Sequence, residues 1–263
     1  MKVYISIVSH GHESLIKQLR CIDGLLAKCT VIIKSNILGE DFSDYQSHPN
    51  FHWVNNMHGL GFGHNNNIIF NLCKENMGMS ESDFFIVLNP DVYVECDKII
   101  ELVTSMNNNS HKFAAINLYK DRDFKVYDNS IRTFPTLAQF ASSFLGSKNT
   151  AILNKDNLRT IQSVDWAAGS FQAFQANHYE RLNGFDERYF MYCEDVDICW
   201  RSKKIDVPLK YYPNIKALHL AKHANRKVLS KHFFWHVAGV FRFLLAKHGL
   251  GKRRSSLDRG YQN

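Results

Sequence analysis

Acidic side chains gather between Leu182 and Arg201, around aromatic residues of the kind that folded proteins bury. The five carboxylates belong to Asp186, Glu187, Glu194, Asp195 and Asp197. Because an ionised group is costly to remove from water unless a metal, a cation or a substrate meets it, the segment is interpreted as the floor of a site. A structural interpretation stays open, since acids favour the first turn of a helix and Asp197 with Arg201 has the spacing of an i,i+4 ion pair.

A second candidate is Asp91, in the tripeptide Asn89-Pro90-Asp91 directly after the apolar run 84–88. At the carboxyl end of a central strand, a carboxylate can hold a hard divalent cation that neutralises substrate phosphates. The same tripeptide forms turns by itself, so a purely structural role is the alternative.

Two further patterns concern phosphate binding. The glycines of Gly59–Asn67 precede asparagines at an expected helix start, where backbone N–H groups favour anions; a loop with an asparagine cap is the alternative.

His219 ends the strand-like run 215–218, where its imidazole would complete a metal site with Asp91, and Arg226 would pair with a diphosphate oxygen. A histidine at a strand end is also common as a structural residue.

Composition narrows the classes of protein. A chain of 263 residues with 45% apolar content can bury one sizeable core, which favours one domain with a C-terminal extension. The six cysteines form no C-x-x-C pair, which argues against a disulfide framework or structural zinc and for a reducing compartment. No signal peptide or apolar stretch of about 18 residues is evident. Motifs of metalloproteases, hydrolase triads and P-loop enzymes are absent.

The positive charge is concentrated in the tail. Residues 226–263 carry nine basic side chains and one acidic one, whereas the first 225 residues carry 23 basic and 24 acidic. This distribution argues against a nucleic-acid partner and for a tail that meets an anionic membrane or a phosphate-bearing partner. As a helix, Val228–His248 would be apolar over about half its circumference and could lie in the membrane interface. Docking on the domain body or on another subunit is the alternative.

Apolar runs alternate with helical patterns along the chain, which predicts an α/β fold with a mostly parallel, doubly wound sheet and ligands beyond the strand ends. Helical spacing recurs at 15–26, 68–72 and 99–106, and 120–163 could form a lid with a helix near 137–145. The expected strands are Val3–Val8, Val31–Lys34, Phe84–Leu88, Phe113–Leu118, Ser170–Gln175, Leu209–Tyr212 and Ile215–Leu218.

The order of these motifs resembles that of bacterial family 2 glycosyltransferases, above all the rhamnosyltransferases of polysaccharide assembly. The resemblance spans Lys2 to about Gly249 and is specific for the family rather than for the sugar. It implies a GT-A fold, with a nucleotide-binding half (1–118), an acceptor-binding half (119–225) and a basic amphipathic helix and tail (226–263). The matching segments are Val8-Ser9-His10, Gly61-Phe62-Gly63-His64-Asn65-Asn66, Leu88-Asn89-Pro90-Asp91-Val92, Arg132-Thr133-Phe134-Pro135-Thr136, Val164-Asp165-Trp166-Ala167-Ala168-Gly169-Ser170-Phe171, Gly184-Phe185-Asp186-Glu187, Glu194-Asp195-Val196-Asp197-Ile198-Cys199-Trp200-Arg201 and His219.

The resemblance also implies site residues. Asp91 would bind Mg²⁺ or Mn²⁺ as the last residue of a degenerate Asp-x-Asp motif, with His219 as a further ligand. Asp195 would be the catalytic base in an inverting transfer, with Glu194 and Asp197 orienting the acceptor or the base. The residues implied to contact the nucleotide sugar are Ser9, Ser35, Asn36, Gly61, Asn66, Asn89 and Arg226.

The acceptor's sugar ring would meet the apolar face of Trp166, whose alternative role is core packing. The chain departs from the family at Ser35-Asn36, where many relatives have Asp-Asn, and at His64. Asn89 in place of the first aspartate of the metal motif is usual for the rhamnosyltransferase branch.

The function expected from these residues is metal-dependent transfer of a sugar, L-rhamnose from its dTDP-activated form, onto a growing and lipid-linked bacterial glycan. The expected location is the cytoplasm, at the cytoplasmic face of the inner membrane. A galactofuranosyl or hexosaminyl transferase using a UDP-sugar is one alternative. A non-catalytic nucleotide- or carbohydrate-binding module is another, since Asn89 and Ser35 weaken two expected contacts. The oligomeric state stays open.

Overall fold

The computed structural model describes residues 1–136, 151–220 and 231–259 of the chain. In this part of the chain one large sheet has the order β3-β2-β1-β4-β10-β6-β11-β5, and β8 pairs with β11. Its strands are β1 (Val3–Ser9), β2 (Thr30–Ser35), β3 (Phe51–Val54), β4 (Phe84–Leu88), β5 (Val92–Tyr93), β6 (Phe113–Tyr119), β8 (Gln162–Ser163), β10 (Phe171–Gln175) and β11 (Lys210–His219).

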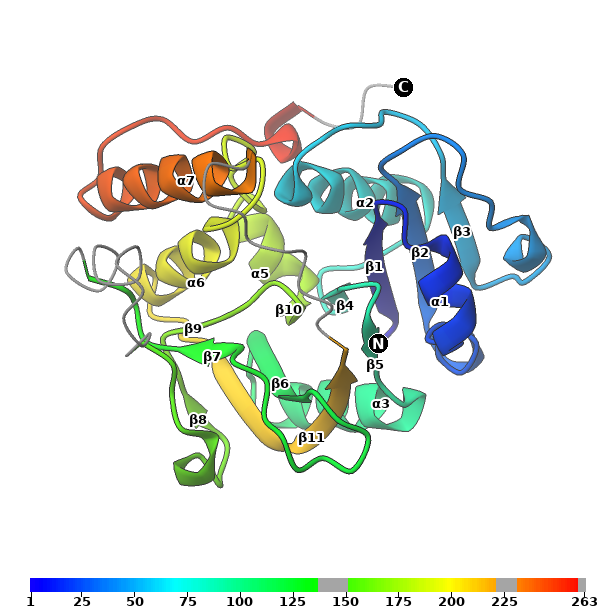
Figure 1. Ribbon diagram of the computed structural model, residues 1–263, viewed down its shortest axis with the longest axis horizontal. Coiled ribbons are helices and arrows are strands. Elements are labelled where there is room, and N and C mark those ends of the chain that lie inside the picture. The colour runs from blue at the N-terminus through cyan, green and yellow to red at the C-terminus, as the bar shows by residue number, and fades with distance from the viewer. Residues whose placement is uncertain (137–150, 221–230, 260–263) are drawn as a thin grey trace.

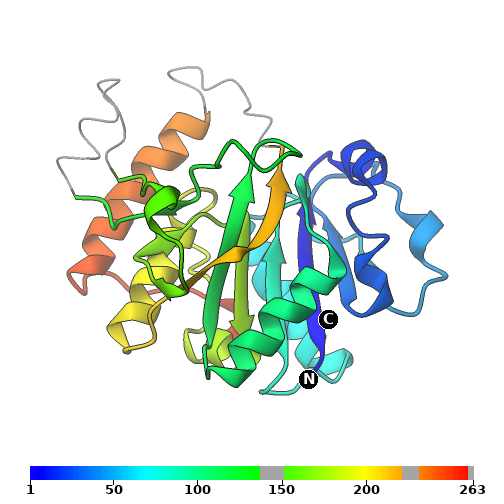
Figure 2. The ribbon, with the colours of Figure 1, turned by 90° about the horizontal axis from the view of Figure 1, so that it is seen from below.

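The direction of the strands is mostly parallel. Strands β1 to β4 are parallel neighbours in the order given, and β6 runs parallel to β11, as Figure 2 shows. Strand β10 lies antiparallel between β4 and β6. A second, two-stranded sheet pairs β7 (Ile131–Arg132) with β9 (Trp166–Ala167). The parallel strand ends therefore meet at one edge of the large sheet, where ligands bind in such folds.

Helices cover both faces of the sheet, and Figure 1 shows α2 and α3 on opposite sides of the strands. Side chains of β1 alternate between the two resulting cores, because successive residues of a strand point to opposite faces. One core involves α1 and α3, and the other involves α2, α5, α6 and α7. The helices are α1 (Glu13–Leu19), α2 (Phe62–Asn76), α3 (Cys96–Asn108), α5 (Ala176–Arg181), α6 (Glu194–Lys204) and α7 (Lys231–Lys247), with short 3₁₀ turns at Leu25–Ala27, Ser43–Tyr45, Lys155–Asn157 and Ser256–Arg259.

The expected strands coincide with β1, β2, β4, β6 and β10 to within one residue at each end. The two short strands expected at 209–212 and 215–218 form one strand, β11, whose register against β6 shifts between Tyr212 and Lys216. Pro213 lies inside that irregularity and has no N–H to donate. The helix predicted from 15–26 ends at Leu19, because Arg20 takes a left-handed conformation with φ 51°. The helix expected near 137–145 lies outside the described residues.

Asn67 of α2 joins the two halves of the chain through its buried amide. Its Oδ1 accepts hydrogen bonds from the Tyr179 hydroxyl at 2.7 Å and from Phe185 N at 2.9 Å, and its Nδ2 donates to Phe185 O at 2.9 Å. Gly184 precedes Phe185 with a φ of +58°, and a Cβ there would lie 2.3 Å from the Asn67 Oδ1 atom. The hydrogen bonds between Asn67 and Phe185 therefore require a residue without a side chain at position 184.

We expect Gly184→Ala to lower the free energy of unfolding by about 2–4 kcal/mol, through backbone strain and the clash with Asn67. Urea denaturation followed by circular dichroism measures this change. Gly24→Ala is the matched control, because Gly24 has a right-handed φ of −70° and a Cβ there would meet no atom within 4 Å. Equal midpoints for the two variants would contradict this account of the Asn67 contact.

Candidate active site

One turn bonds both to the backbone just before Asp91 and to the side chain of Asp195, two predicted site acids that are 104 positions apart in the chain. Asn89 N, two residues before Asp91, donates to Ser170 O at 3.0 Å. The adjacent Gly169 N donates to Asp195 Oδ2 at 3.1 Å. The turn at Gly169-Ser170, just before β10, therefore fixes the end of β4 relative to the start of α6.

His219 lies between two carboxylates at the end of β11. It stands opposite Val92 in the pairing of β11 with β5, which brings its Nε2 atom to 3.4 Å from Asp91 Oδ1. On the other side, its Nδ1 atom is 2.6 Å from Asp128 Oδ2. Burial opposes the charged imidazole, but the hydrogen bonds to Asp128 and Asp91 outweigh it and raise the pKa of His219 to about 9.

The Asp91–His219 pair fits a divalent cation. A carboxylate oxygen and the nitrogen of a neutral imidazole are both ligands of Mn²⁺, and a 3.4 Å separation suits neighbouring positions around one ion with ligand distances of roughly 2.1 Å. Because the two carboxylates favour the protonated form of His219, a cation bound here would have to displace that proton. In the described ranges, no group of three such side chains is arranged to hold an ion by itself. A cation at this pair would thus need further ligands, such as diphosphate oxygens or water.

Asp128 is a residue that the sequence analysis missed. Its side chain is buried, its backbone N donates to Leu118 O at 3.0 Å, and the Lys155 ammonium donates to the same carbonyl at 3.0 Å and to the Ser130 hydroxyl at 3.3 Å. The hydrogen bond to Nδ1 directs the other ring nitrogen of His219 toward Asp91. Asp128 stands in a polar run with no periodicity, so the sequence contains no signal for this contact.

Asp195 lies in the first turn of α6, where burial raises its pKa. The backbone N–H groups of Gly169 and Val196 donate to its two oxygens at 3.1 and 2.8 Å and partly offset that effect. The neighbouring Glu194 is buried, and the pKa of its carboxyl is raised well above the usual value by burial and then by the charge of Asp195. These two acids are therefore adjacent groups that resist being ionised together.

The other three acids of the segment have partners within the protein. Asp197 is fully buried and pairs with Arg201 Nε at 2.7 Å, so its predicted acceptor contact stays a prediction. Asp186 binds the guanidinium of Arg188, and Glu187 Oε1 accepts a hydrogen bond from Ser256 N at 2.6 Å. The segment is thus divided: three acids have hydrogen-bonded partners that stabilise the fold, whereas the roles predicted for Glu194 and Asp195 stay predictions.

Trp166 lies in β9 as a buried side chain. Its Nε1 atom donates to Thr133 O at 2.8 Å, and the guanidinium carbon of Arg132 lies 5.1 Å from the centre of its ring. The indole is therefore held by a hydrogen bond and a cation–π contact and packs in one of the two cores, which agrees with the core-packing alternative. The predicted contact with the acceptor stays a prediction.

The nucleotide residues predicted on the first two strands lie side by side. Ser9 of β1 pairs in register with Ser35 of β2. The Ser9 hydroxyl donates to Glu40, whose Oε1 atom also accepts the N–H groups of Gly11 and His12, both at 3.0 Å. Glu40, which the sequence analysis did not single out, thus fixes the loop after β1.

Asn36 is bonded to the glycine-rich loop. Its Nδ2 atom donates to Leu60 O at 2.9 Å and its Oδ1 atom accepts from Leu60 N at 3.0 Å. Ser35 Oγ accepts a hydrogen bond from Trp53 Nε1 at 3.0 Å. Side-chain atoms of both residues are therefore engaged inside the protein, and their predicted base contacts stay predictions.

The other residues predicted to contact the nucleotide sugar lie at α2 and after β4. Asn66 is buried and accepts a hydrogen bond from the Ser6 hydroxyl at 2.6 Å, and Asn89 is placed by its backbone bond to the turn before β10. Gly61 allows a close approach, since a Cβ there would lie 2.7 Å from Phe190 O. Arg226 lies outside the described residues.

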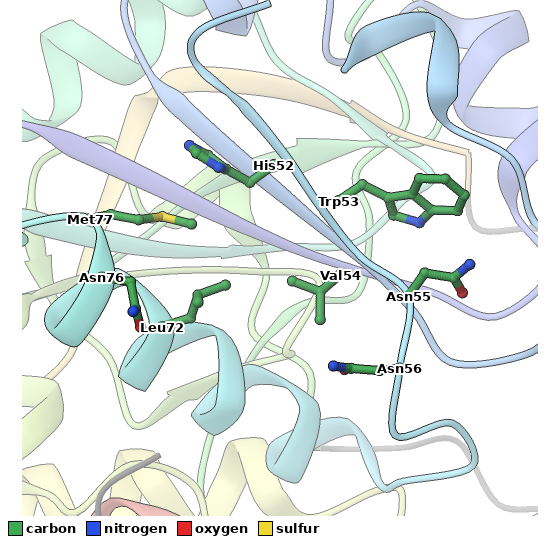
Figure 3. Close-up of a pocket in the computed structure, with 8 residues that line it drawn as sticks. All are labelled: His52, Trp53, Val54, Asn55, Asn56, Leu72, Asn76 and Met77. Atoms are coloured by element: carbon green, nitrogen blue, oxygen red, sulfur yellow. The ribbon is translucent and has the colours of Figure 1, made fainter. Parts of the chain in front are cut away.

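A hollow of about 440 Å³ lies elsewhere, between β3 and the end of α2 (Figure 3). None of the predicted site residues lines it, although Trp53 borders it and donates to Ser35. We therefore locate the candidate active site at the Gly169-Ser170 turn and not at this hollow. The lining residues are His52, Trp53, Val54, Asn55, Asn56, Leu72, Asn76 and Met77.

Solved structures with this fold include glycosyltransferases. GalNAc-T7, crystallised with UDP, GalNAc and Mn²⁺, matches 93% of this chain and 47% of its own, with a TM-score of 0.62 and 13% identity. S. aureus TarS 1-349 in complex with UDP-GlcNAc matches 93% of this chain and 67% of its own, with a TM-score of 0.56 and 9% identity. These likenesses show that the fold is the GT-A fold expected from the sequence.

Sequence relatives are more specific. The chain is 36% identical to rhamnosyltransferase WbbL of Escherichia coli K12 over 256 residues, which are 95% of this chain and 96% of the relative. It is 31% identical over 63% of its length to an N-acetylglucosaminyl-diphospho-decaprenol L-rhamnosyltransferase of Mycobacterium tuberculosis, of which it covers 56%. No protein-family model matches the chain. By its near full-length relative and its GT-A fold, the chain belongs to the family 2 glycosyltransferases related to the rhamnosyltransferases.

Proposed function

We propose that the protein transfers L-rhamnose from dTDP-L-rhamnose to a hydroxyl of a lipid-linked glycan, with inversion at the anomeric carbon and with Mg²⁺ or Mn²⁺. The E. coli relative named as a rhamnosyltransferase supports the donor sugar. The mycobacterial relative, whose name specifies a diphospho-decaprenol, supports a lipid-linked acceptor.

One observation carries this proposal: the Gly169-Ser170 turn binds both the backbone before Asp91 and the carboxylate of Asp195. A residue suited to hold a cation and a residue suited to take a proton thus lie at the same edge of the sheet. Inverting transfer needs this arrangement, because the base acts from the face opposite the leaving group.

Asp195 acts as the base that takes the proton of the acceptor hydroxyl as this oxygen attacks the anomeric carbon. Burial raises the pKa of Asp195, which makes its carboxylate a stronger base than a solvated aspartate. The backbone N–H groups of Gly169 and Val196 hold the carboxylate in a fixed orientation. Burial and the charge of Asp195 also raise the pKa of the neighbouring Glu194 carboxyl, which favours its protonated form, and this form can donate a hydrogen bond.

Asp91 and His219 hold the cation side of the site, and Asp128 fixes the ring of His219. When bound, the cation supplies positive charge that stabilises the diphosphate leaving group. The glycine-rich loop, tied to β2 through Asn36 and Leu60, lines the donor.

Helix α7 carries the proposed membrane contact. Gly239, Val240 and Phe243 are buried, whereas the opposite side exposes Phe234, Phe241 and Leu245 by 58%, 63% and 52%. No described helix is long and apolar enough to cross a bilayer. The exposed cations Lys252, Arg253 and Arg254 follow this helix, and they complement an anionic lipid surface. We propose a peripheral position on the cytoplasmic face of the inner membrane.

Asp195→Asn preserves shape but removes the base, so we expect turnover to fall roughly 10²–10⁴-fold while dTDP affinity is retained. A rhamnose-transfer assay and titration calorimetry measure the two effects. Asp206→Asn, at an exposed position with φ 59°, is the matched control. Full turnover by Asp195→Asn would exclude this residue as the base and favour a binding module.

Asp128→Ala releases His219 and should weaken Mn²⁺ binding in the presence of dTDP roughly 10–100-fold. Asp128→Asn should restore part of the affinity, because an amide oxygen still accepts the Nδ1 hydrogen bond. Electron paramagnetic resonance of free Mn²⁺ measures binding without turnover, and Asp91→Ala is the reference for complete loss. Wild-type affinity in Asp128→Ala would show that this carboxylate does not support the metal site.

A double substitution, Phe241→Ser with Leu245→Ser, should release the protein from vesicles of anionic phosphatidylglycerol, because it removes exposed apolar area. Flotation on a density gradient measures this, with neutral phosphatidylcholine vesicles as the lipid control. Point variants are preferred to a truncation, since Ser256 N and Arg254 O bond to Glu187 in the body. Undiminished flotation would argue against a lipid role for this side of the helix.

A further inference from the structure

The segment Tyr189–Cys193 connects the donor loop with the catalytic base. At one end, Phe190 O accepts a hydrogen bond from Phe62 N at 2.9 Å, next to the close approach of Gly61. At the other end, Cys193 is the N-cap residue of α6, two positions before Asp195. The place of this segment therefore sets the spacing between the nucleotide loop and the proposed base.

The backbone of this segment is strained. Tyr192 and Cys193 have φ values of 72° and 69°, both in the left-handed region that residues with a side chain rarely adopt. Two consecutive residues of this kind persist only where the surroundings hold them in place. The cause of their conformation must therefore be sought in contacts from outside the segment.

Helix α7 supplies those contacts. The ring of Trp235 lies 4.5 Å from the ring of Phe190, centre to centre. His232 Nδ1 is 3.1 Å from the Tyr192 hydroxyl. The backbone of Gly239 lies so close to the turn that a Cβ there would be 2.9 Å from Tyr192 O. Figure 1 shows α7 along α6, the helix that this turn begins, and the two helices are in contact.

We propose that Trp235 and His232 of α7 are positioning residues that hold the strained turn, and through it Asp195, at the correct distance from the donor. This inference rests on the proposed function of Asp195. It gives the two sides of α7 separate tasks: the side that contacts Phe190 and Tyr192 fixes the catalytic geometry, and the opposite side meets the lipid surface. A displacement of about 1 Å at the base is enough to slow transfer strongly.

The test is Trp235→Ala, assayed with a soluble acceptor analogue and without vesicles. We expect kcat to fall roughly 10-fold or more. We expect unchanged dTDP affinity and stoichiometry, because Phe62 bonds to the backbone rather than the ring of Phe190, and Asn36 holds Leu60 of the donor loop separately. Trp235→Phe should restore most of the rate, since it retains an aromatic ring against Phe190. His248→Ala is the control, because it removes an exposed ring just beyond the same helix, and it should leave kcat unchanged.

Two results would contradict the proposed positioning role of α7. An unchanged kcat in Trp235→Ala would show that α7 does not position the base. A parallel loss of dTDP binding and kcat would show that Trp235 supports the whole fold instead. Failure of the proposed function gives a different result, because Asp195→Asn would then retain full turnover. If Asp195→Asn loses turnover but Trp235→Ala keeps a normal kcat, only the positioning role of α7 is rejected.

Discussion

Two hydrogen bonds made by the backbone of Gly169-Ser170, one to Asn89 N and one to the Asp195 carboxylate, are the constraint on which the candidate active site depends. Parallel strands end at one edge of a sheet, so β4 delivers Asp91 there by topology alone. Asp195 comes from a helix on one face and needs a separate attachment, which the N–H of Gly169 provides. A Cβ at 169 would lie 3.1 Å from the Phe62 ring and 3.7 Å from Asp195 Cβ, so this contact leaves little room for a side chain.

Burial and pairing together decide which acids are available for chemistry. Asp197 is as deeply buried as any acid in the protein, but Arg201 pairs with it and donates in turn to the carbonyls of Leu182 and Gly184. No ion pair of this kind is seen for Asp195 or Glu194 in the described structure, and burial raises the pKa of both carboxyls. The charge of Arg132 partly offsets this effect at Asp195. The same segment thus supplies both a structural ion pair and the two acids that we propose for catalysis and acceptor binding.

The strands that carry the candidate site were easier to predict from the sequence than the side chains that hold the site residues in place. Strands β1 and β4 were predictable because strands buried on both faces are continuous apolar runs, and Asp91 was predictable from its place after one of them. Asp128 and Glu40 were not, since a polar residue in a loop acquires its partners only when distant segments pack together. The division of the acidic segment also depends on distant partners, such as Ser256 for Glu187. Periodicity predicted α7 but not which apolar side would be buried.

The cation side of the site depends on charge balance around Asp128. Burial lowers the pKa of the Lys155 ammonium to about 8, so close to neutral pH this group is more easily discharged than a solvated lysine. In its charged form it attracts Asp128 and bonds to Leu118 O and Ser130, beside the carboxylate that orients His219. Loss of this charge would remove a cation from the buried Asp128 without moving any ligand of the proposed metal. Through the charge of Asp128, the buried Lys155 is therefore coupled electrostatically to the carboxylate that bonds to His219 Nδ1.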